Sequence, residues 1–143
     1  MADIFHDFPI NAPLSRVFEA VSSPPGLDAW WTKDSSGEAR VGAEYQLGFG
    51  PNYDWRARVM QCAKDSAFEL EITQADADWT GTRIGFSLEN RAGTTNVHFH
   101  HTGWPQQNEH WRISCYCWAM YLRILRRHVE YGEFVPYEKR LDV

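Results

Sequence analysis

The chain has 143 residues, of which 43% are hydrophobic and 23% charged, and these values are ordinary for one globular domain with its own core. Its formal charge of −5, from 14 basic and 19 acidic side chains, argues against the basic surface that non-specific nucleic-acid binding needs. No segment approaches the roughly 18 consecutive apolar residues of a membrane-spanning helix, so we expect no membrane insertion.

The N-terminal part predicts one strand followed by two short helices. Apolar residues alternate over residues 4–10, which is the period of a strand with one buried face. Pro13 suits the first turn of a helix, and residues 14–21 carry apolar side chains at i, i+3, i+4 and i+7. A break at residues 22–26 ends this helix, and residues 27–31 predict a second short one.

The middle of the chain predicts a series of strands. Apolar and polar residues alternate there, and the segments between them are short. Short connections favour an antiparallel meander with one exposed face. The expected strands cover residues 38–40, 43–49, 53–62, 68–72, 84–88 and 95–101.

A long amphipathic helix is expected from Trp111 to Gly132, with the glycine as its C-terminal cap. Apolar side chains cover more than half of its circumference, which is more than a surface helix needs. We therefore expect this helix to be packed on more than one side. The element order predicts an α+β helix-grip fold, in which a curved antiparallel sheet wraps around the C-terminal helix, as one domain over residues 1–143.

Four segments resemble a known family. They are residues 12–21 (APLSRVFEAV), 25–31 (PGLDAWW), 95–104 (TNVHFHHTGW) and 118–132 (WAMYLRILRRHVEYG). In this order they are similar to the activator of heat-shock protein 90 ATPase-like family of the START-like (SRPBCC) superfamily. The resemblance implies the START/Bet v-like helix-grip fold and, from the family name, a chaperone partner. The family's small, glycine-containing run before the helix tryptophan is replaced here by residues 115–117 (CYC).

Inward-facing residues of the strands and the long helix are candidates for a ligand cavity between the two. A concave, aromatic-lined space with few polar groups is the usual form of a site for a small apolar ligand. We therefore expect non-enzymatic binding of a small hydrophobic or aromatic ligand. The alternative is that these rings fill the core. The expected lining residues are Trp55, Phe86, Phe99, His101, Trp111, Cys115, Trp118 and Leu122.

His101 leaves three interpretations open. It is expected on the inner face of the last strand, next to Gly103 and Trp104. An inward imidazole can be a general acid–base, a hydrogen-bond anchor for a ligand, or a core histidine whose nitrogens are satisfied by protein groups. An enzyme of the cyclase, dehydratase or hydrolase type would depend on this residue.

Other polar clusters favour structural roles. His98 and His100 are expected on the outer face of the same strand, where a solvated surface is favoured over a metal site. Arg123, Arg126 and Arg127 predict a solvated helix face. No cofactor motif is present, so we expect neither a cofactor nor a metal. An exposed aromatic strand edge could also support a homodimer.

The cysteines and the N-terminus indicate a reducing compartment. Three cysteines, at positions 62, 115 and 117, do not form an even disulfide framework. Residues 1–3 lack the basic and apolar segments of a secretory leader. We therefore expect a cytoplasmic protein with reduced thiols, and a structural role for Cys115.

Overall fold

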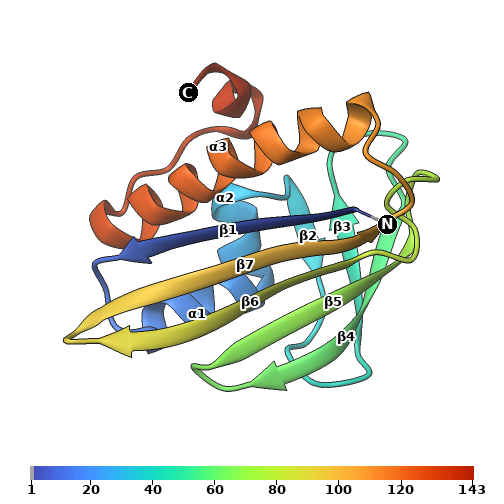
Figure 1. Cartoon of the computed structure of the whole chain (residues 1–143). Coiled ribbons are helices and arrows are strands. Elements are labelled where there is room, and N and C mark those ends of the chain that lie inside the picture. The colour runs from blue at the N-terminus through green and yellow to red at the C-terminus, as the bar shows by residue number, and fades with distance from the viewer. Residues whose placement is uncertain (1) are drawn as a thin grey trace.

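The computed structural model describes residues 2–143 and contains one antiparallel sheet of seven strands, in the order β1-β7-β6-β5-β4-β3-β2 (Figure 1). The strands are β1 (Ala2–Ile10), β2 (Asp34–Ser36), β3 (Glu44–Gly48), β4 (Trp55–Ala63), β5 (Ala67–Gln74), β6 (Arg83–Arg91) and β7 (Thr94–Trp104). The helices are α1 (Leu14–Ser22), α2 (Pro24–Trp30), α3 (Glu109–Tyr131) and the short 3-10 helix η1 (Tyr137–Asp142).

The three α-helices cover one face of the curved sheet, and the core lies between the two layers. Helix α1 contacts β5, β6 and β7, while α3 contacts β1, α1 and α2. Figure 1 shows α3 running along the β1 side of the sheet, with η1 beyond it. This is the expected helix-grip fold, which is therefore confirmed.

The register of β6 and β7 explains which side chains enter the core. Phe86 stands opposite Phe99 and Ile84 stands opposite His101, and all four are buried. Because successive strand residues point to opposite faces, His98 and His100 lie on the outer face, as the alternation predicts.

Helix α3 is delimited by its caps. The Asn108 side chain accepts a hydrogen bond from the backbone N–H of Trp111 at 2.9 Å, and Gly132 ends the helix with φ 71°. The expected apolar stripe is buried at Trp118, Leu122 and further residues toward the C-terminus. Within residues 2–143, no helix is long and apolar enough to cross a membrane.

The expected strand at residues 38–40 is wrong. The strand in this region is β2, which pairs Asp34 with Gly48 of β3. Residues 38–40 lie in the exposed connection between two glycines with positive φ, Gly37 and Gly42. These three residues have no apolar side chain to bury beyond Ala39, so a strand there would gain little from packing.

Candidate functional site

A cavity of about 330 Å³ lies between α3, the β3–β4 connection, the β5–β6 loop and η1. We call it the aromatic cavity. Its walls are Trp31, Phe49, Tyr53, Trp55 and Trp79 from the loops and strand ends, Tyr137 from η1, and His110, Ile113, Ser114, Cys117, Trp118 and Tyr121 from α3 and its first turn.

Five of these side chains form a closed ring of contacts, which we call the aromatic collar. Neighbouring ring centroids lie 5.2 to 5.9 Å apart, within the range of favourable aromatic pairs. Trp79 and Trp118 are stacked, with an interplanar angle of 19°. The order around the collar is Trp31, Phe49, Trp55, Trp79 and Trp118, which contacts Trp31 again.

His101 holds two members of the collar from behind through a chain of hydrogen bonds. The indole N–H of Trp118 donates to His101 Nδ1 at 3.0 Å. His101 Nε2 donates to the Thr82 hydroxyl at 2.8 Å, and that hydroxyl donates to the Trp79 carbonyl at 2.6 Å. The chain fixes the imidazole as the Nε2–H tautomer because Nδ1 must accept. It also sets the positions of Trp118 and Trp79 relative to each other.

The same environment keeps His101 neutral. The residue is fully buried, and this burial, with smaller contributions from His100 and His110, lowers its pKa from 6.5 to about 3. Both ring nitrogens are occupied by protein groups. Of the three interpretations, this geometry matches the satisfied core histidine, since no nitrogen is left for a ligand or a transferred proton.

Trp79 is the largest of the lining residues that sequence reasoning missed entirely. It lies in the β5–β6 loop, where Asp76 Oδ1 accepts a hydrogen bond from its backbone N–H at 2.9 Å and turns the chain inward. The side chain is 8% exposed, and its Nε1–H is buried without an acceptor among residues 2–143. A tryptophan in an otherwise polar loop was the available signal, because so large a ring is rarely left in water.

Polar side chains gather at one end of the aromatic cavity. His110 Nδ1 lies 2.9 Å from Asp78 Oδ2, and the Asn108 amide donates to the same carboxylate at 3.3 Å. The hydrogen bond from His110 is the largest cause of the lowered pKa of Asp78. These contacts tie the β5–β6 loop to the start of α3. Across residues 2–143, no group of three or more His, Cys, Asp or Glu side chains is arranged to hold a metal ion.

The C-terminal segment closes another wall. The Tyr137 hydroxyl donates to the Phe49 carbonyl at 3.2 Å. Arg140 is 1% exposed and donates to the carbonyls of Asp28, Thr32 and one further residue, at 2.7 to 3.0 Å. A buried guanidinium needs such acceptors, so Arg140 anchors η1 and thereby holds Tyr137 against the cavity.

The eight expected lining residues separate into three groups. Trp55 and Trp118 do line the aromatic cavity. Phe86, Phe99 and His101 do not, because they are buried in the layer behind Trp118, where Phe99 contacts its ring at 4.7 Å. These three side chains therefore pack behind the tryptophans and do not line the aromatic cavity, and their expected contact with a ligand stays a prediction.

The remaining three residues lie outside the aromatic cavity. Trp111 is half-buried elsewhere, Leu122 faces β1, and Cys115 Sγ lies 3.9 Å from His6 Nε2. Cys117 lines the cavity in place of Cys115. Successive helix positions are rotated by about 100°, so residues two apart face nearly opposite directions. The apolar side chains of α3 pack against more than one element of the fold. A helical wheel shows that they are buried, but not which element each of them contacts.

Several solved structures share this fold. The Aha1 dimer from Colwellia psychrerythraea is 26% identical, with a TM-score of 0.83 over 93% of this chain and 99% of that one. Protein BH1534 from Bacillus halodurans is 23% identical, with a TM-score of 0.73 over 91% and 98% of the two chains. CalU16 from Micromonospora echinospora is 14% identical, with a TM-score of 0.74 over 98% and 83%. The last two similarities establish the fold alone.

Comparison with known sequences leads to a family. No curated protein matches this chain. The family model described as "Activator of Hsp90 ATPase homolog 1-like protein" matches residues 11–130, which include every collar residue and His101. The resemblance noted in the four sequence segments is thus confirmed, and the chain belongs to the family of activator of Hsp90 ATPase homolog 1-like proteins.

Proposed function

We propose that the aromatic cavity binds a small, planar, largely apolar ligand, without chemical turnover. The observation that carries this proposal is the aromatic collar, which offers several ring faces and edges around one space of about 330 Å³. This volume is at the lower end of the range of small-molecule sites. A ligand of one or two fused rings is therefore the best match in size.

Two further features narrow the ligand. Trp55 is half-buried and Tyr53 is 49% exposed, so the cavity has an open side beside these rings. His110 and Ser114 also line the cavity, and these polar side chains favour a ligand that carries an oxygen. The proposed ligand is thus an aromatic molecule with one polar oxygen group.

The absence of turnover rests on His101. An acid–base enzyme of the cyclase, dehydratase or hydrolase type would need an imidazole that can exchange protons with a substrate. His101 lies behind Trp118 and keeps its pKa near 3, with both nitrogens engaged. We assign it a positioning role, in which it orients the ring that the ligand stacks on.

Two matched tryptophan variants test the binding proposal. Trp55 and Trp111 are both half-buried, but only Trp55 lines the aromatic cavity. Calorimetric titration with 2-naphthol, a fused-ring phenol, should show binding to the wild type that Trp55→Ala weakens by about tenfold, because one stacking face is lost. Trp111→Ala should change the affinity by less than about twofold, since stacking in the cavity is untouched. Equal losses in both variants, or no binding to the wild type, would contradict the proposal.

Family membership favours a second proposal, a co-chaperone-like interaction with a heat-shock protein 90 homologue. Large side chains are exposed on the outer side of α3 and on the C-terminal segment, with Tyr116 at 79%, Phe134 at 64% and Leu141 at 71%. Such a surface suits a protein partner. Stimulation of the chaperone's ATPase rate by the wild type, and its loss in Tyr116→Ser, would support this function, and an unchanged rate would exclude it. A cytoplasmic location belongs to the same proposal.

A homodimer is proposed on a separate observation, because the similar Aha1 protein from Colwellia psychrerythraea is a dimer in solution. Sedimentation velocity at several protein concentrations separates a 16.6 kDa monomer from a particle of twice that mass. A single monomeric species at the highest concentration would exclude the proposed homodimer.

A further inference from the structure

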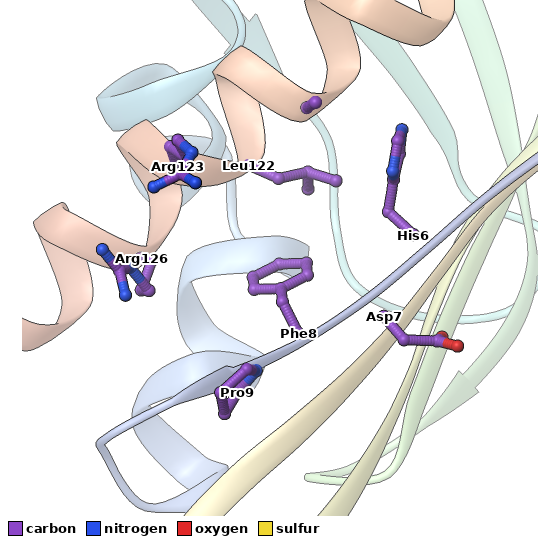
Figure 2. A pocket seen from close by; sticks show the side chains of 8 residues that line it. His6, Asp7, Phe8, Pro9, Leu122, Arg123 and Arg126 are labelled. Carbon is purple, nitrogen blue, oxygen red and sulfur yellow. The ribbon is translucent and has the colours of Figure 1, made fainter.

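A second hollow, of about 290 Å³, lies on the other side of α3, between this helix and β1. We call it the basic groove. Figure 2 shows its side chains, with two arginines from α3 at one end and His6 from β1 at the other. The lining residues are His6, Asp7, Phe8, Pro9, Ala119, Leu122, Arg123 and Arg126.

Within the described residues, the two arginines of the groove lack the carboxylate partner that five other arginines of the chain have. Arg40, Arg83 and Arg127, for example, each lie within 3.3 Å of a glutamate carboxylate. Arg123 and Arg126 have no carboxylate partner within residues 2–143, although acidic residues outnumber basic ones. Arg126 also has a buried Nε–H without an acceptor among the described residues. A buried donor of a charged group is costly to leave unpaired.

Two carboxylates on the elements that line the groove have partners elsewhere. Asp7 lies 2.8 Å from His98 Nδ1 on the outer face of the sheet, and Figure 2 shows its oxygens pointing away from both arginines. Glu130, one helical turn beyond Arg126, accepts the backbone N–H of Asn11 at 2.9 Å. The positive charge at this end of the groove is therefore not neutralised by the described part of the chain.

The floor between the two ends is apolar. Phe8 is half-buried, and Figure 2 shows its ring lying between β1 and α3, beside Leu122. At the far end, His6 Nε2 donates to the Cys115 carbonyl at 3.3 Å, so this imidazole is held against α3. A cationic end joined to an aromatic and aliphatic floor matches a molecule with an anionic head and a short apolar body.

We propose that the basic groove binds a small carboxylic acid with an apolar body. The carboxylate lies against Arg123 and Arg126, since guanidinium groups match the two oxygens of a carboxylate in geometry and charge. The apolar body covers Phe8 and Leu122. This site is separate from the aromatic cavity, so the two proposals fail or succeed independently.

The probes are octanoate, octanamide and inorganic phosphate. Their binding is measured through the amide chemical shifts of the ¹⁵N-labelled protein. Octanoate should shift the signals of residues 6–9 and 119–126. Octanamide, which keeps the chain but lacks the charge, should bind at least about tenfold more weakly, in line with the worth of a hydrogen bond to a charged group. Phosphate, which has no apolar body, should also bind more weakly than octanoate. Equal binding of octanamide, or of phosphate, would overturn the proposal.

Variants on α3 provide the matched comparison. Arg126→Gln and Arg123→Gln should each weaken octanoate binding by about tenfold. Arg112→Gln removes an exposed arginine of the same helix outside the groove. The affinity for octanoate should change by less than about twofold in this variant. Arg123 is exposed, so its replacement remains informative if Arg126→Gln unfolds. Trp55→Ala should bind octanoate like the wild type, and a loss there would place the acid in the aromatic cavity and contradict the inference.

Discussion

The aromatic cavity and the basic groove lie on opposite sides of α3 and differ in how their polar groups are satisfied. Behind the cavity, His101 and Thr82 complete a chain of hydrogen bonds that fixes Trp118 and Trp79. In the groove, Arg123 and Arg126 have no carboxylate partner among residues 2–143. One wide apolar helix thus lines two hollows of different chemistry, one walled by aromatic rings and the other ending in two arginines.

The largest effect is expected from Trp118→Ala, which removes a buried member of the aromatic collar. Truncation of a buried tryptophan should lower the free energy of unfolding by about 4 kcal/mol, because a large cavity remains. Urea unfolding measures this loss, and titration with 2-naphthol should show that binding is abolished. Octanoate binding should persist in the folded fraction. If octanoate binding is lost as well, the two regions are not independent.

Arg140→Met should have the next largest effect. The substitution leaves the carbonyls of Asp28 and Thr32 without their donor, and we expect a loss of about 3 kcal/mol in unfolding free energy. Because Tyr137 is then no longer held against the cavity, 2-naphthol should dissociate faster in stopped-flow measurements. Lys139→Met, at an exposed neighbouring position, is the control. Identical dissociation rates in both variants would show that η1 is not a wall of the site.

The buried His101 predicts a dependence of stability on pH. In the unfolded chain its pKa is the ordinary 6.5, whereas in the folded protein it is about 3. Between these two values His101 is protonated in the unfolded state but neutral in the folded state. The free energy of unfolding therefore falls as the pH drops below 6.5. The expected loss from this group is about 2 kcal/mol between pH 7 and pH 5.

The variant His101→Phe isolates this contribution. It should be less stable than the wild type at pH 7, since Trp118 and Thr82 lose their partner, but its stability should change less between pH 7 and pH 5. Urea unfolding at the two pH values provides the measurement. An equal pH dependence in both proteins would mean that His101 is not the neutral, buried group described above.

The smallest effect is expected from Tyr137→Phe, which deletes the hydrogen bond to the Phe49 carbonyl. A loss of about 1 kcal/mol in unfolding free energy should accompany a twofold to threefold weaker affinity for 2-naphthol, at roughly the value of one hydrogen bond. Octanoate affinity in the basic groove should not change. A change of equal size for both ligands would indicate a general loss of order instead.

The sequence was sufficient for the fold because the long strands and helices carried their own periods. Alternation over residues 4–10 and 95–101 and the stripe through Trp118 and Leu122 are local signals of burial, and each was confirmed. The one wrong strand, at residues 38–40, was supported by its position between other strands and not by apolar residues that it would bury.

The site was less predictable, because its walls come from segments without a period. Trp79 lies in a loop and Tyr137 in the short helix η1, and both reach the cavity through tertiary contacts that no local pattern encodes. On α3, choosing Cys117 over Cys115 required knowing which neighbour each side of the helix faces. Burial of an aromatic residue was predictable from its type, but its position relative to a cavity was not.

The most direct test of the central claim is the indole N–H region of a ¹H–¹⁵N correlation spectrum, which holds one signal for each of the seven tryptophans. Addition of 2-naphthol should move the signals of Trp79 and Trp55 strongly, because the ligand packs against both rings. The signal of Trp111, outside the aromatic cavity, should stay in place. Movement of Trp111 alone, or of no signal at saturating ligand, would contradict the account.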